Sequence, residues 1–353
     1  MSKTYLVTGG AGFIGSNFIR YMMREHGDVF IINVDKLTYA GNLANVADVA
    51  SDDRYCFVRA DICDRKAIGA LFGEYDIDAV INFAAESHVD RSIASPGVFV
   101  STNVGGTVNL LDCARSAWED GDGSYPPGKK FLQVSTDEVY GTLSLENREE
   151  FFTEDMALEP NSPYSASKAA ADLFVLSYGA TYGLPVNITR CSNNYGPYQH
   201  PEKLIPHMIL NAVAHRPLPV YGDGQNVRDW LFVDDHCRAI DLVLNNAAPG
   251  EIYNVGGHNE RSNIEVVSHL VAMCSQYLDD EGISTELIEY VEDRKGHDRR
   301  YGIAPDKIAE DLGWQPQVLF REGIESTAKW YLENLAWVRQ VADVDDSRDG
   351  CSE

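Results

Sequence analysis

A strand that runs directly into a glycine-rich turn is the feature that most limits how this chain can fold. The apolar and β-branched run Lys3–Thr8 leads without a break into Gly9-Gly10-Ala11-Gly12-Phe13-Ile14-Gly15. Gly9, Gly12 and Gly15 fit the spacing GxxGxxG, and the run also contains GxGxxG. In such strand–turn–helix units, glycine permits the tight turn and lets the backbone approach a pyrophosphate at the helix N-terminus. The motif predicts a dinucleotide site at the start of a parallel α/β domain.

Short strands alternate with helix-length segments through the first half of the chain. The strand candidates are Lys3–Thr8, Val29–Asp35, Tyr55–Arg59, Ala79–Phe83, Phe131–Ser135 and Val186–Cys191. Segments of helical length separate most of them, which suits βαβ units. We therefore predict an α/β fold, a Rossmann-type doubly wound parallel sheet with a smaller C-terminal α/β lobe that binds the substrate.

The rhythm of strands and helices breaks up from about Asn193 onward, where prolines punctuate the sequence. We predict a dinucleotide-binding domain that carries the catalytic residues over 1–192, and a mainly substrate-binding lobe over 193–340, some segments of which can return to the first domain. Residues 341–353 are predicted to be a frayed acidic tail. Trp118–Lys130, rich in Gly, Pro and charge, is predicted to be a surface loop.

The charge balance limits the classes of partner. The chain has 353 residues with 54 acids against 29 bases, a formal charge of -25. Such a field opposes binding to nucleic acid and to anionic membranes. An anionic ligand must then be held by local bases and backbone N–H groups. A strongly acidic surface is also compatible with a salty cytoplasm, which one sequence leaves open.

The cysteines and the apolar runs exclude further classes. Seven cysteines are scattered without a CxxC pair, which argues against a disulfide framework or a zinc site, so we expect reduced, buried thiols and no metal. No apolar run approaches the roughly 18 to 20 residues of a membrane span. The N-terminus reads as a strand and not as a signal peptide, so a cytoplasmic location is expected.

An acid after the second strand indicates which dinucleotide is bound. Asp35 follows Gly15 by twenty residues, the position from which a carboxylate accepts ribose hydroxyls and repels a 2′-phosphate. NAD is therefore favoured over NADP. Asp61 and Ile62, past the third strand, are candidates for adenine contacts, although Asp61 could equally cap a helix. Small residues from Asn82 to Ala85 leave room for the dinucleotide.

A tyrosine and a lysine four residues apart form a candidate base. Tyr164 and Lys168 lie on one face of a stretch that is expected to be helical through Ser177. A nearby cation stabilises a phenolate and lowers the phenol pKa from about 10. The pair alone is common on protein surfaces, but behind a dinucleotide-binding unit it predicts a base for a sugar hydroxyl.

Two adjacent acids follow the strand that ends near Ser135. In an open α/β sheet, ligands lie at the carboxyl ends of the strands, which is where Asp137 and Glu138 are expected. Elimination of water needs an acid and a base at adjacent carbons, and two close carboxyl groups have divergent pKa values. The other interpretation is structural, because Ser135-x-x-Glu138 matches a helix capping box.

Several longer segments carry a resemblance to a known family. They are TGGAGFIGS, INFAAESHVDRSI, STDEVYG, YSASK, RCSNNYGPYQHPEKLIP, VRDWLFVDDHCRAI and DRKGHDRRY, which span residues 8 to about 301. With them the chain resembles the extended short-chain dehydrogenase/reductase family and, within it, the nucleotide-sugar 4,6-dehydratases. Thr136-Asp137-Glu138 is the most specific element, because simple epimerases of the family usually lack the acid pair. Lys295 departs from the family pattern, which commonly has a proline there.

The resemblance implies a role for each catalytic candidate. Thr136 would hydrogen-bond the sugar's 4-hydroxyl, and Tyr164 would deprotonate it while hydride passes from C4 to NAD. Lys168 would lower the tyrosine pKa and hold the nicotinamide ribose. Glu138 would remove the C5 proton and Asp137 would protonate the departing C6 hydroxyl. Return of hydride to C6 would give a 4-keto-6-deoxy sugar, and the substrate most compatible with the resemblance is dTDP-D-glucose.

Binding residues follow from the motifs and from the same resemblance. The cofactor candidates are Gly9, Gly12, Phe13, Ile14, Gly15, Asp35, Lys36, Leu37, Thr38, Asp61, Ile62, Ala84, Ala85, Thr102, Tyr164, Lys168 and Asn194. The substrate candidates are Ser87, Thr136, Asn193, Lys203, Leu204, Pro219, Tyr221, Arg228, Asn263, Arg294 and His297. The resemblance also implies a homodimer built through a helix bundle that includes the helix of Tyr164.

Three other functions stay open at this point. A 4,6-dehydratase specific for a UDP-sugar would use the same residues. A nucleotide-sugar 4-epimerase shares the cofactor site, Tyr164 and Lys168, but needs no acid for a C6 leaving group. A non-catalytic NAD(H)-sensing protein on this fold would not need the four reactive side chains.

Overall fold

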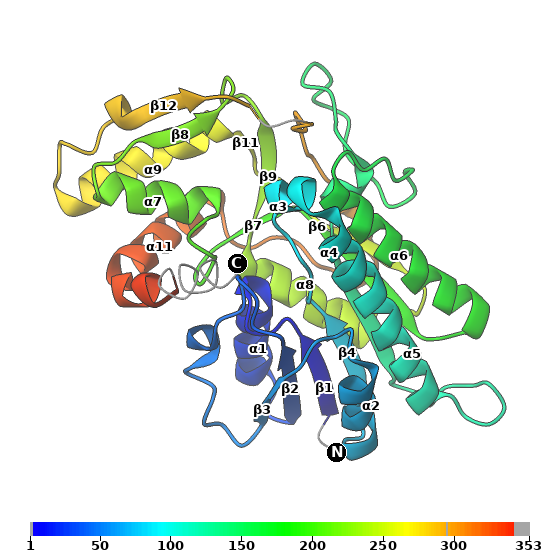
Figure 1. Cartoon of the computed structure of the whole chain (residues 1–353). Helices are drawn as coiled ribbons and strands as arrows, with labels where there is room; N and C mark the ends of the chain where they lie inside the picture. Colours follow the sequence, from blue (N-terminus) through cyan, green and yellow to red (C-terminus); the bar gives the residue numbers. More distant parts are fainter. Residues whose placement is uncertain (1–2, 294–295, 342–353) are drawn as a thin grey trace.

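A parallel sheet of seven strands forms the centre of the computed structural model, which describes residues 3–293 and 296–341 (Figure 1). The strand order is β10-β6-β5-β4-β1-β2-β3. The strands are β1 (Lys3–Thr8), β2 (Val29–Asp35), β3 (Tyr55–Arg59), β4 (Ala79–Asn82), β5 (Lys130–Thr136), β6 (Val186–Cys191) and β10 (Ile252–Val255). All six predicted strands are present within a residue of their expected ends. The prediction missed β10, which pairs in parallel with β6.

Helices cover both faces of this sheet. On one face α1 (Phe13–Glu25), α8 (Val233–Asn246) and α10 (Asp306–Leu312) contribute to one apolar core. On the other face α2 (Arg65–Glu74), α5 (Thr107–Trp118) and α6 (Pro163–Tyr182) contribute to a second. The doubly wound α/β architecture is therefore confirmed.

A smaller lobe lies beside the carboxyl ends of the sheet, at the upper left of Figure 1. It contains a three-stranded sheet of β11 (Glu260–Ser262), β9 (Val227–Phe232) and β7 (Asn193–Tyr195), and a parallel pair of β8 (Leu218–Tyr221) and β12 (Ile288–Val291). The helices α7 (Leu204–Val213), α9 (Asn263–Leu278) and α11 (Phe320–Glu333) pack around a third core. The boundary at residue 193 stays a prediction: β7 follows it directly, whereas α8, β10 and α10 pack with the first domain.

The helix of Tyr164 begins and ends at clear sequence signals. Ser162 caps α6 in a capping box with Ser165, and Pro163 occupies the first turn, where a missing N–H does not matter. Gly183, with φ of 67°, ends the helix in the left-handed region. The helix thus extends five residues beyond Ser177, to Tyr182.

Short helical segments join the larger elements. They are α3 (Val89–Ala94), α4 (Pro96–Phe99), the π-helical segment η2 (Val100–Gly106) and the 3₁₀ segments η1 (Leu43–Val46), η3 (Asp137–Tyr140) and η4 (Thr285–Leu287). The segment η2 continues directly into α5. In the predicted loop Trp118–Lys130, the end residues belong to α5 and β5, and only the residues between them form the loop.

The six cysteines in the described ranges are free, and four are buried, but Cys63 is exposed, contrary to the expectation of buried thiols. Within residues 3–293 and 296–341 no helix is long and apolar enough to cross a bilayer. The predicted acidic tail lies outside the described residues, except for Val341, and so does Cys351.

Candidate active site

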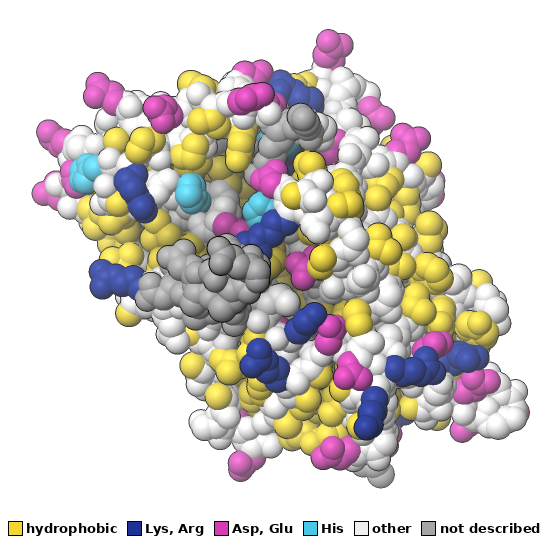
Figure 2. Space-filling model, viewed as in Figure 1, with side chains coloured by type: hydrophobic (Ala, Val, Ile, Leu, Met, Phe, Trp, Pro, Cys, Tyr) yellow, Lys and Arg dark blue, Asp and Glu magenta, His cyan; other side chains and the backbone are white. Residues whose placement is uncertain are grey.

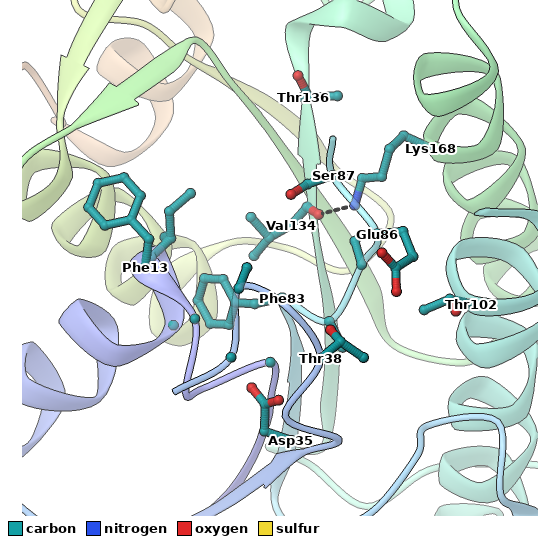
Figure 3. A pocket seen from close by; sticks show the side chains of 18 of the residues that line it. Phe13, Asp35, Thr38, Phe83, Glu86, Ser87, Thr102, Val134, Thr136 and Lys168 are labelled. Carbon is teal, nitrogen blue, oxygen red and sulfur yellow. Dashed lines mark hydrogen bonds between the residues drawn. The ribbon is translucent and has the colours of Figure 1, made fainter. Parts of the chain in front are cut away.

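A cavity of about 340 Å³ lies along the carboxyl ends of the central strands. Figure 3 shows Phe13 from α1, Asp35 from the end of β2, Thr136 from the end of β5 and Lys168 from α6 around the same space. Every cofactor candidate except Leu37 lines it. Of the catalytic candidates, Thr136, Glu138, Tyr164 and Lys168 line it, and so do the substrate candidates Ser87, Asn193 and Lys203.

The glycine turn leaves no room for side chains. Gly9 has φ of 68°, and a Cβ there would lie 2.7 Å from the backbone nitrogen of Ala84. Gly12 is the N-cap of α1, where no side chain caps the helix and no acid occupies the first turn. Free N–H groups at a helix N-terminus attract an anionic group. This part of the cavity therefore fits the pyrophosphate of a dinucleotide.

The carboxylate of Asp35 links the glycine turn to the loop after β2. One oxygen accepts a hydrogen bond from the Ala11 N–H at 3.0 Å, and the other accepts one from the Leu37 N–H at 2.8 Å. The side chain lines the cavity although the residue is only 8% exposed. The structure thus places a fixed carboxylate where the ribose of a dinucleotide is expected.

Asp61 lies next to this region and is not a helix cap. Its carboxylate pairs with the Lys36 ammonium at 2.7 Å and accepts a hydrogen bond from the Cys63 N–H at 2.9 Å. Asp64 caps the following helix, α2, through the N–H groups of Lys66 and Ala67. The helix-cap interpretation of Asp61 is therefore wrong.

Tyr164 and Lys168 face the cavity from α6. The Lys168 ammonium donates a hydrogen bond to the Val134 carbonyl at 2.7 Å (Figure 3). Burial lowers the pKa of Lys168. Burial and the Glu138 carboxylate raise the pKa of Tyr164 well above its usual value. The predicted lowering of the tyrosine pKa is thus wrong for this structure, because desolvation and a nearby carboxylate both disfavour the phenolate.

The two adjacent acids have different environments. Glu138 lines the cavity, whereas Asp137 is only 2% exposed and accepts a hydrogen bond from the Thr136 hydroxyl at 3.3 Å. Burial and the charge of Glu138 raise the pKa of Asp137 well above its usual value. Asp137 therefore holds its proton more tightly than an exposed aspartate does. It does not itself line the cavity, but it directly precedes Glu138, which does.

The local turn around these acids differs from the capping-box interpretation. Thr136, not Ser135, is the N-cap of η3, and its hydroxyl accepts a hydrogen bond from the Glu138 N–H at 3.3 Å. The Glu138 side chain lines the cavity. The capping-box interpretation of Ser135 and Glu138 is wrong in its cap residue.

The remaining substrate candidates lie in the smaller lobe and do not line the cavity. They are Leu204, Pro219, Tyr221, Arg228, Asn263 and His297. The Arg228 guanidinium, 8% exposed, donates to the Asp298 carbonyl at 2.9 Å and lies over the Tyr301 ring. His297 hydrogen-bonds Asp293 at 2.6 Å beside the Tyr221 ring. Arg294 and Lys295 lie outside the described residues.

Sequence reasoning missed several residues of the cavity wall. They are Val134, Cys191, Ser192, Glu86, Gln199 and His200. Cys191 ends β6 and Ser192 directly follows it, Val134 lies two residues before the end of β5, and Glu86 lies in the loop after β4. Their place near strand ends was the available signal. In the described ranges no group of three or more His, Cys, Asp or Glu side chains is arranged to hold a metal ion.

Comparisons with known proteins identify the family of the chain. A family model described as GDP-mannose 4,6 dehydratase matches residues 6–327. The chain belongs to this family. Within the GDP-mannose 4,6-dehydratase family, it is 51% identical over 343 residues to the dTDP-glucose 4,6-dehydratase of Neisseria meningitidis serogroup B, covering 96% of each chain. It is 50% identical to dTDP-glucose 4,6-dehydratase 1 of Escherichia coli K12, covering 95% of this chain and 94% of that protein.

Solved structures of family members show what these relatives bind. The dTDP-glucose 4,6-dehydratase of Bacillus anthracis in complex with NAD has a TM-score of 0.85 and 46% identity, covering 96% of this chain and all of that one. The Streptomyces venezuelae enzyme of the same name, with NAD and TYD bound, has a TM-score of 0.86 and 47% identity, covering 96% and 99%. A UDP-glucose 4-epimerase of Thermotoga maritima with UDP-glucose has a TM-score of 0.81 but only 28% identity, covering 94% and 99%.

Proposed function

We propose that this chain is an NAD-dependent dTDP-glucose 4,6-dehydratase, a hydro-lyase that converts dTDP-D-glucose to dTDP-4-keto-6-deoxy-D-glucose and water. The observation that carries the proposal is the acid pair: Glu138 lines the same cavity as Tyr164 and Lys168, and the adjacent Asp137 is buried with a raised pKa. Relatives with this activity in their names, near 50% identity over almost the whole chain, support it. The product class places the enzyme in deoxysugar biosynthesis.

The residues of the glycine turn would hold the cofactor. Gly9, Gly12 and the amino end of α1 fit its pyrophosphate, and Asp35 fits its adenosine ribose. NAD supplies a cationic nicotinamide ring that accepts a hydride from the sugar and returns it later in the same turnover. Asp35 disfavours a 2′-phosphate through charge repulsion, so NAD is preferred to NADP.

Oxidation at C4 is assigned to Thr136, Tyr164 and Lys168. Thr136 hydrogen-bonds the 4-hydroxyl, and Tyr164 takes its proton as the C4–H bond is broken. Because burial and Glu138 favour the protonated phenol, a phenolate at neutral pH needs nearby positive charge. Lys168 supplies that charge from one helical turn away, on the same face of α6.

Elimination is assigned to the acid pair. The C4 ketone makes the C5 proton acidic, and Glu138 removes it. Asp137 gives its proton to the C6 hydroxyl, which departs as water. A hydride then forms the new C6–H bond, a proton returns to C5, and the product is a 4-keto-6-deoxy sugar with no net change of redox state.

The variant Glu138→Gln with Asp137→Asn tests this division of labour. Neither substitution greatly changes side-chain volume, so hydride should still pass from C4 while elimination loses its base and its acid. Absorbance of the reduced nicotinamide should therefore rise and persist, and 4-keto-6-deoxy sugar should fall by about 10² to 10⁴ in rate. Stopped-flow absorbance with product analysis measures both.

Two outcomes of that experiment would contradict the assignment. A folded double variant that makes neither reduced cofactor nor product would show that the acids are needed for oxidation. A variant that still makes product at a good rate would leave the acids a structural role only.

The wild-type protein supplied with dTDP-glucose separates the alternative functions, because an epimerase gives the galactose epimer and a sensing protein gives nothing. A panel with UDP-glucose, GDP-mannose and CDP-glucose tests the nucleotide preference.

A homodimer is part of the same proposal. Large apolar side chains are exposed along α4, η2 and α6, namely Val98 (48%), Val100 (58%), Leu173 (57%) and Phe174 (42%). Figure 2 shows apolar side chains spread over this side of the molecule, at the right of the view. A self-complementary patch on a helix pair is the usual basis of a twofold dimer. A cytoplasmic location completes the proposal.

A further inference from the structure

A buried carboxylate lies on the same helix face as the two reactive residues of α6. Asp172 follows Lys168 by four residues, as Lys168 follows Tyr164. Side chains with this spacing lie one above the other on an α-helix. Asp172 is 0% exposed and does not line the cavity. The proposed reaction gives it no part.

Arg190, on the neighbouring strand β6, fixes the orientation of this carboxylate. Its Nε atom lies 2.9 Å from Asp172 Oδ2, and both side chains are almost completely buried. The guanidinium also donates to the Tyr140 hydroxyl at 2.8 Å, which in turn donates to Asn254 Oδ1 at 2.8 Å. The network continues into β10, so Asp172 is held from the sheet as well as from its own helix.

Asp172 lies one helical turn from Lys168 on the same face of α6, and its ion pair is with Arg190. From β5 the Val134 carbonyl accepts one hydrogen bond from the ammonium. The charged or titratable groups that act on Lys168 are Asp172 on its own helix and the Cys191 thiol on β6, and Asp172 acts more strongly. Burial favours the neutral form of the lysine, and a nearby carboxylate favours the charged form.

The surroundings of Tyr164 make that charge important. Glu138 and Asp137 from η3, Cys191 from β6 and Tyr39 from the loop after β2 all favour the protonated phenol. The ring of Phe99, from α4, adds an apolar neighbour 6.4 Å from the Tyr164 ring. A neutral Lys168 would therefore leave these groups unopposed within the protein.

We infer that Asp172 is a positioning residue for the proposed reaction: it keeps Lys168 charged and aligned below Tyr164, and Arg190 holds the Asp172 carboxylate in place. The inference rests on the proposed function. Burial raises the pKa of Asp172, and Arg190 and Lys168 counteract that rise. One carboxylate between two cations thus stabilises the charge of both, and three consecutive turns of α6 act as a unit.

The variant Asp172→Asn tests the inference through the pH dependence of kcat/KM in the holoenzyme. Without the carboxylate, Lys168 loses its proton at lower pH, so the alkaline limb of the profile should move down. The phenolate of Tyr164 becomes harder to form, so the acid limb should move up. A closely paired opposite charge shifts a pKa by about 1 to 3 units. Because Asp172 acts on Lys168 from one helical turn away, each limb should move by up to about one pH unit.

A readout that does not depend on turnover accompanies the profile. Lys168 is assigned to the nicotinamide ribose, so NAD affinity should fall where the lysine becomes neutral. Calorimetric titration with NAD at increasing pH should show this fall at lower pH in Asp172→Asn than in the wild type. If the wild type binds NAD but does not dehydrate dTDP-glucose, the proposed function fails while this titration still tests the inference.

Two further variants separate positioning from simple structural support. Removal of one partner of a buried ion pair is destabilising, whereas replacement of both is often tolerated. The double variant Asp172→Asn with Arg190→Met should therefore regain thermal stability while both pH limbs stay displaced. Asp172→Glu keeps the charge and should keep both limbs close to those of the wild type.

The inference is overturned by any of three results. A folded Asp172→Asn enzyme with wild-type limbs and a wild-type pH dependence of NAD affinity would show that the carboxylate does not act on Lys168. A double variant that regains both stability and the wild-type profile would show that Asp172 only neutralises Arg190. An Asp172→Glu profile displaced as far as that of Asp172→Asn would show that side-chain shape, not charge, matters.

Discussion

Asp35 combines a predicted binding role with a scaffold role that its sequence position did not reveal. Both of its oxygens accept backbone hydrogen bonds, from Ala11 in the glycine turn and Leu37 in the next loop. Asp35→Ala should therefore weaken NAD binding and relax discrimination against NADP. It should also lower the free energy of unfolding by about 1 to 3 kcal/mol, because one buried and one partly buried N–H group lose their acceptor. Calorimetry with both cofactors and urea unfolding measure these effects.

A matched control for Asp35 is the neighbouring Asp61, which pairs with Lys36 at 30% side-chain exposure. Asp61→Ala removes a partly solvated pair and should leave the ratio of NAD to NADP affinity unchanged. An Asp35→Ala protein with an unaltered affinity ratio would place the discriminating charge elsewhere.

His236 makes the stability of the fold depend on pH. The imidazole is 0% exposed, its Nδ1 atom lies 3.0 Å from Asn194 Oδ1, and burial lowers its pKa from 6.5 to about 3. Between pH 6.5 and about 3, the His236 imidazole binds a proton in the unfolded chain but not in the folded chain. Stability is therefore complete above that pH and falls toward pH 3, by up to about 1.4 kcal/mol per pH unit.

The variant His236→Gln tests this contribution. It should unfold more easily at neutral pH. On acidification, however, its unfolding should take up about one proton less than unfolding of the wild type, so its free energy of unfolding should decline less steeply with falling pH. Urea unfolding at a series of pH values measures the slope. His269→Gln, at an exposed position of α9, is the control and should keep the wild-type slope. Equal slopes for wild type and His236→Gln would mean that the buried imidazole does not control this uptake.

At the scale of elements, the turn between β1 and α1 depends on the absence of a side chain at Gly9. Its φ of 68° is unfavourable for other residues, and a Cβ would lie 2.7 Å from the Ala84 nitrogen on the neighbouring strand end. Gly9→Ala should cost at least about 1 to 2 kcal/mol from the dihedral alone. Because the displaced turn is the pyrophosphate cradle, NAD affinity should fall by roughly tenfold or more.

Gly69, inside α2, is the matched control for Gly9. A Cβ at Gly69 meets nothing within 4 Å, and alanine in a helix interior is favoured over glycine by about 0.5 to 1 kcal/mol. Gly69→Ala should thus be neutral or stabilising with unchanged NAD affinity. Thermal unfolding and NAD titration of the two variants compare them directly. Equal effects of both substitutions would refute the specific role of the turn.

The elements also show what the sequence could and could not predict. The strands β1 to β6 were predictable because each is a compact run with β-branched residues, and helix-length segments separate most of them. β10 is only four residues long, Ile252–Val255, and its partner β6 lies some sixty residues earlier. Nothing local marks such a pairing. The same limit explains why α8, although helical, packs with the first domain instead of the lobe that precedes it.

In the site, residues carried by motifs were predictable and their electrostatics were not. Tyr164, Lys168 and Glu138 line the cavity as expected. The raised pKa of Tyr164 depends on burial and on a carboxylate from another element, which helix spacing alone does not show. Asp172 is likewise an ordinary helical acid in sequence. Its importance appears only where the long-range contact with Arg190 is seen.

At the scale of the whole molecule, charge and apolar surface have opposite effects on self-association. A formal charge of -25 keeps copies of the chain apart. Apolar side chains on α4, η2 and α6 nevertheless stay exposed, with Val100 at 58% and Leu173 at 57%. Exposure of this kind on one side of a strongly charged protein favours a specific interface over general aggregation. Salt should therefore strengthen the proposed homodimer by screening the repulsion.

The variant Val100→Lys with Leu173→Lys tests the dimer. Two lysines per subunit would be desolvated in a twofold interface without partners, which is unfavourable by several kcal/mol. Light scattering should then show half the wild-type mass, while circular dichroism shows an unchanged fold. Leu319, 66% exposed at the start of α11, is the control, and Leu319→Lys should leave the mass unchanged.

Two results would show that the face formed by α4, η2 and α6 is not the interface. One is a wild-type protein that stays monomeric even in high salt, and the other is a double variant of undiminished mass. Because α6 carries Tyr164 and Lys168, loss of the dimer should also reduce dehydratase activity.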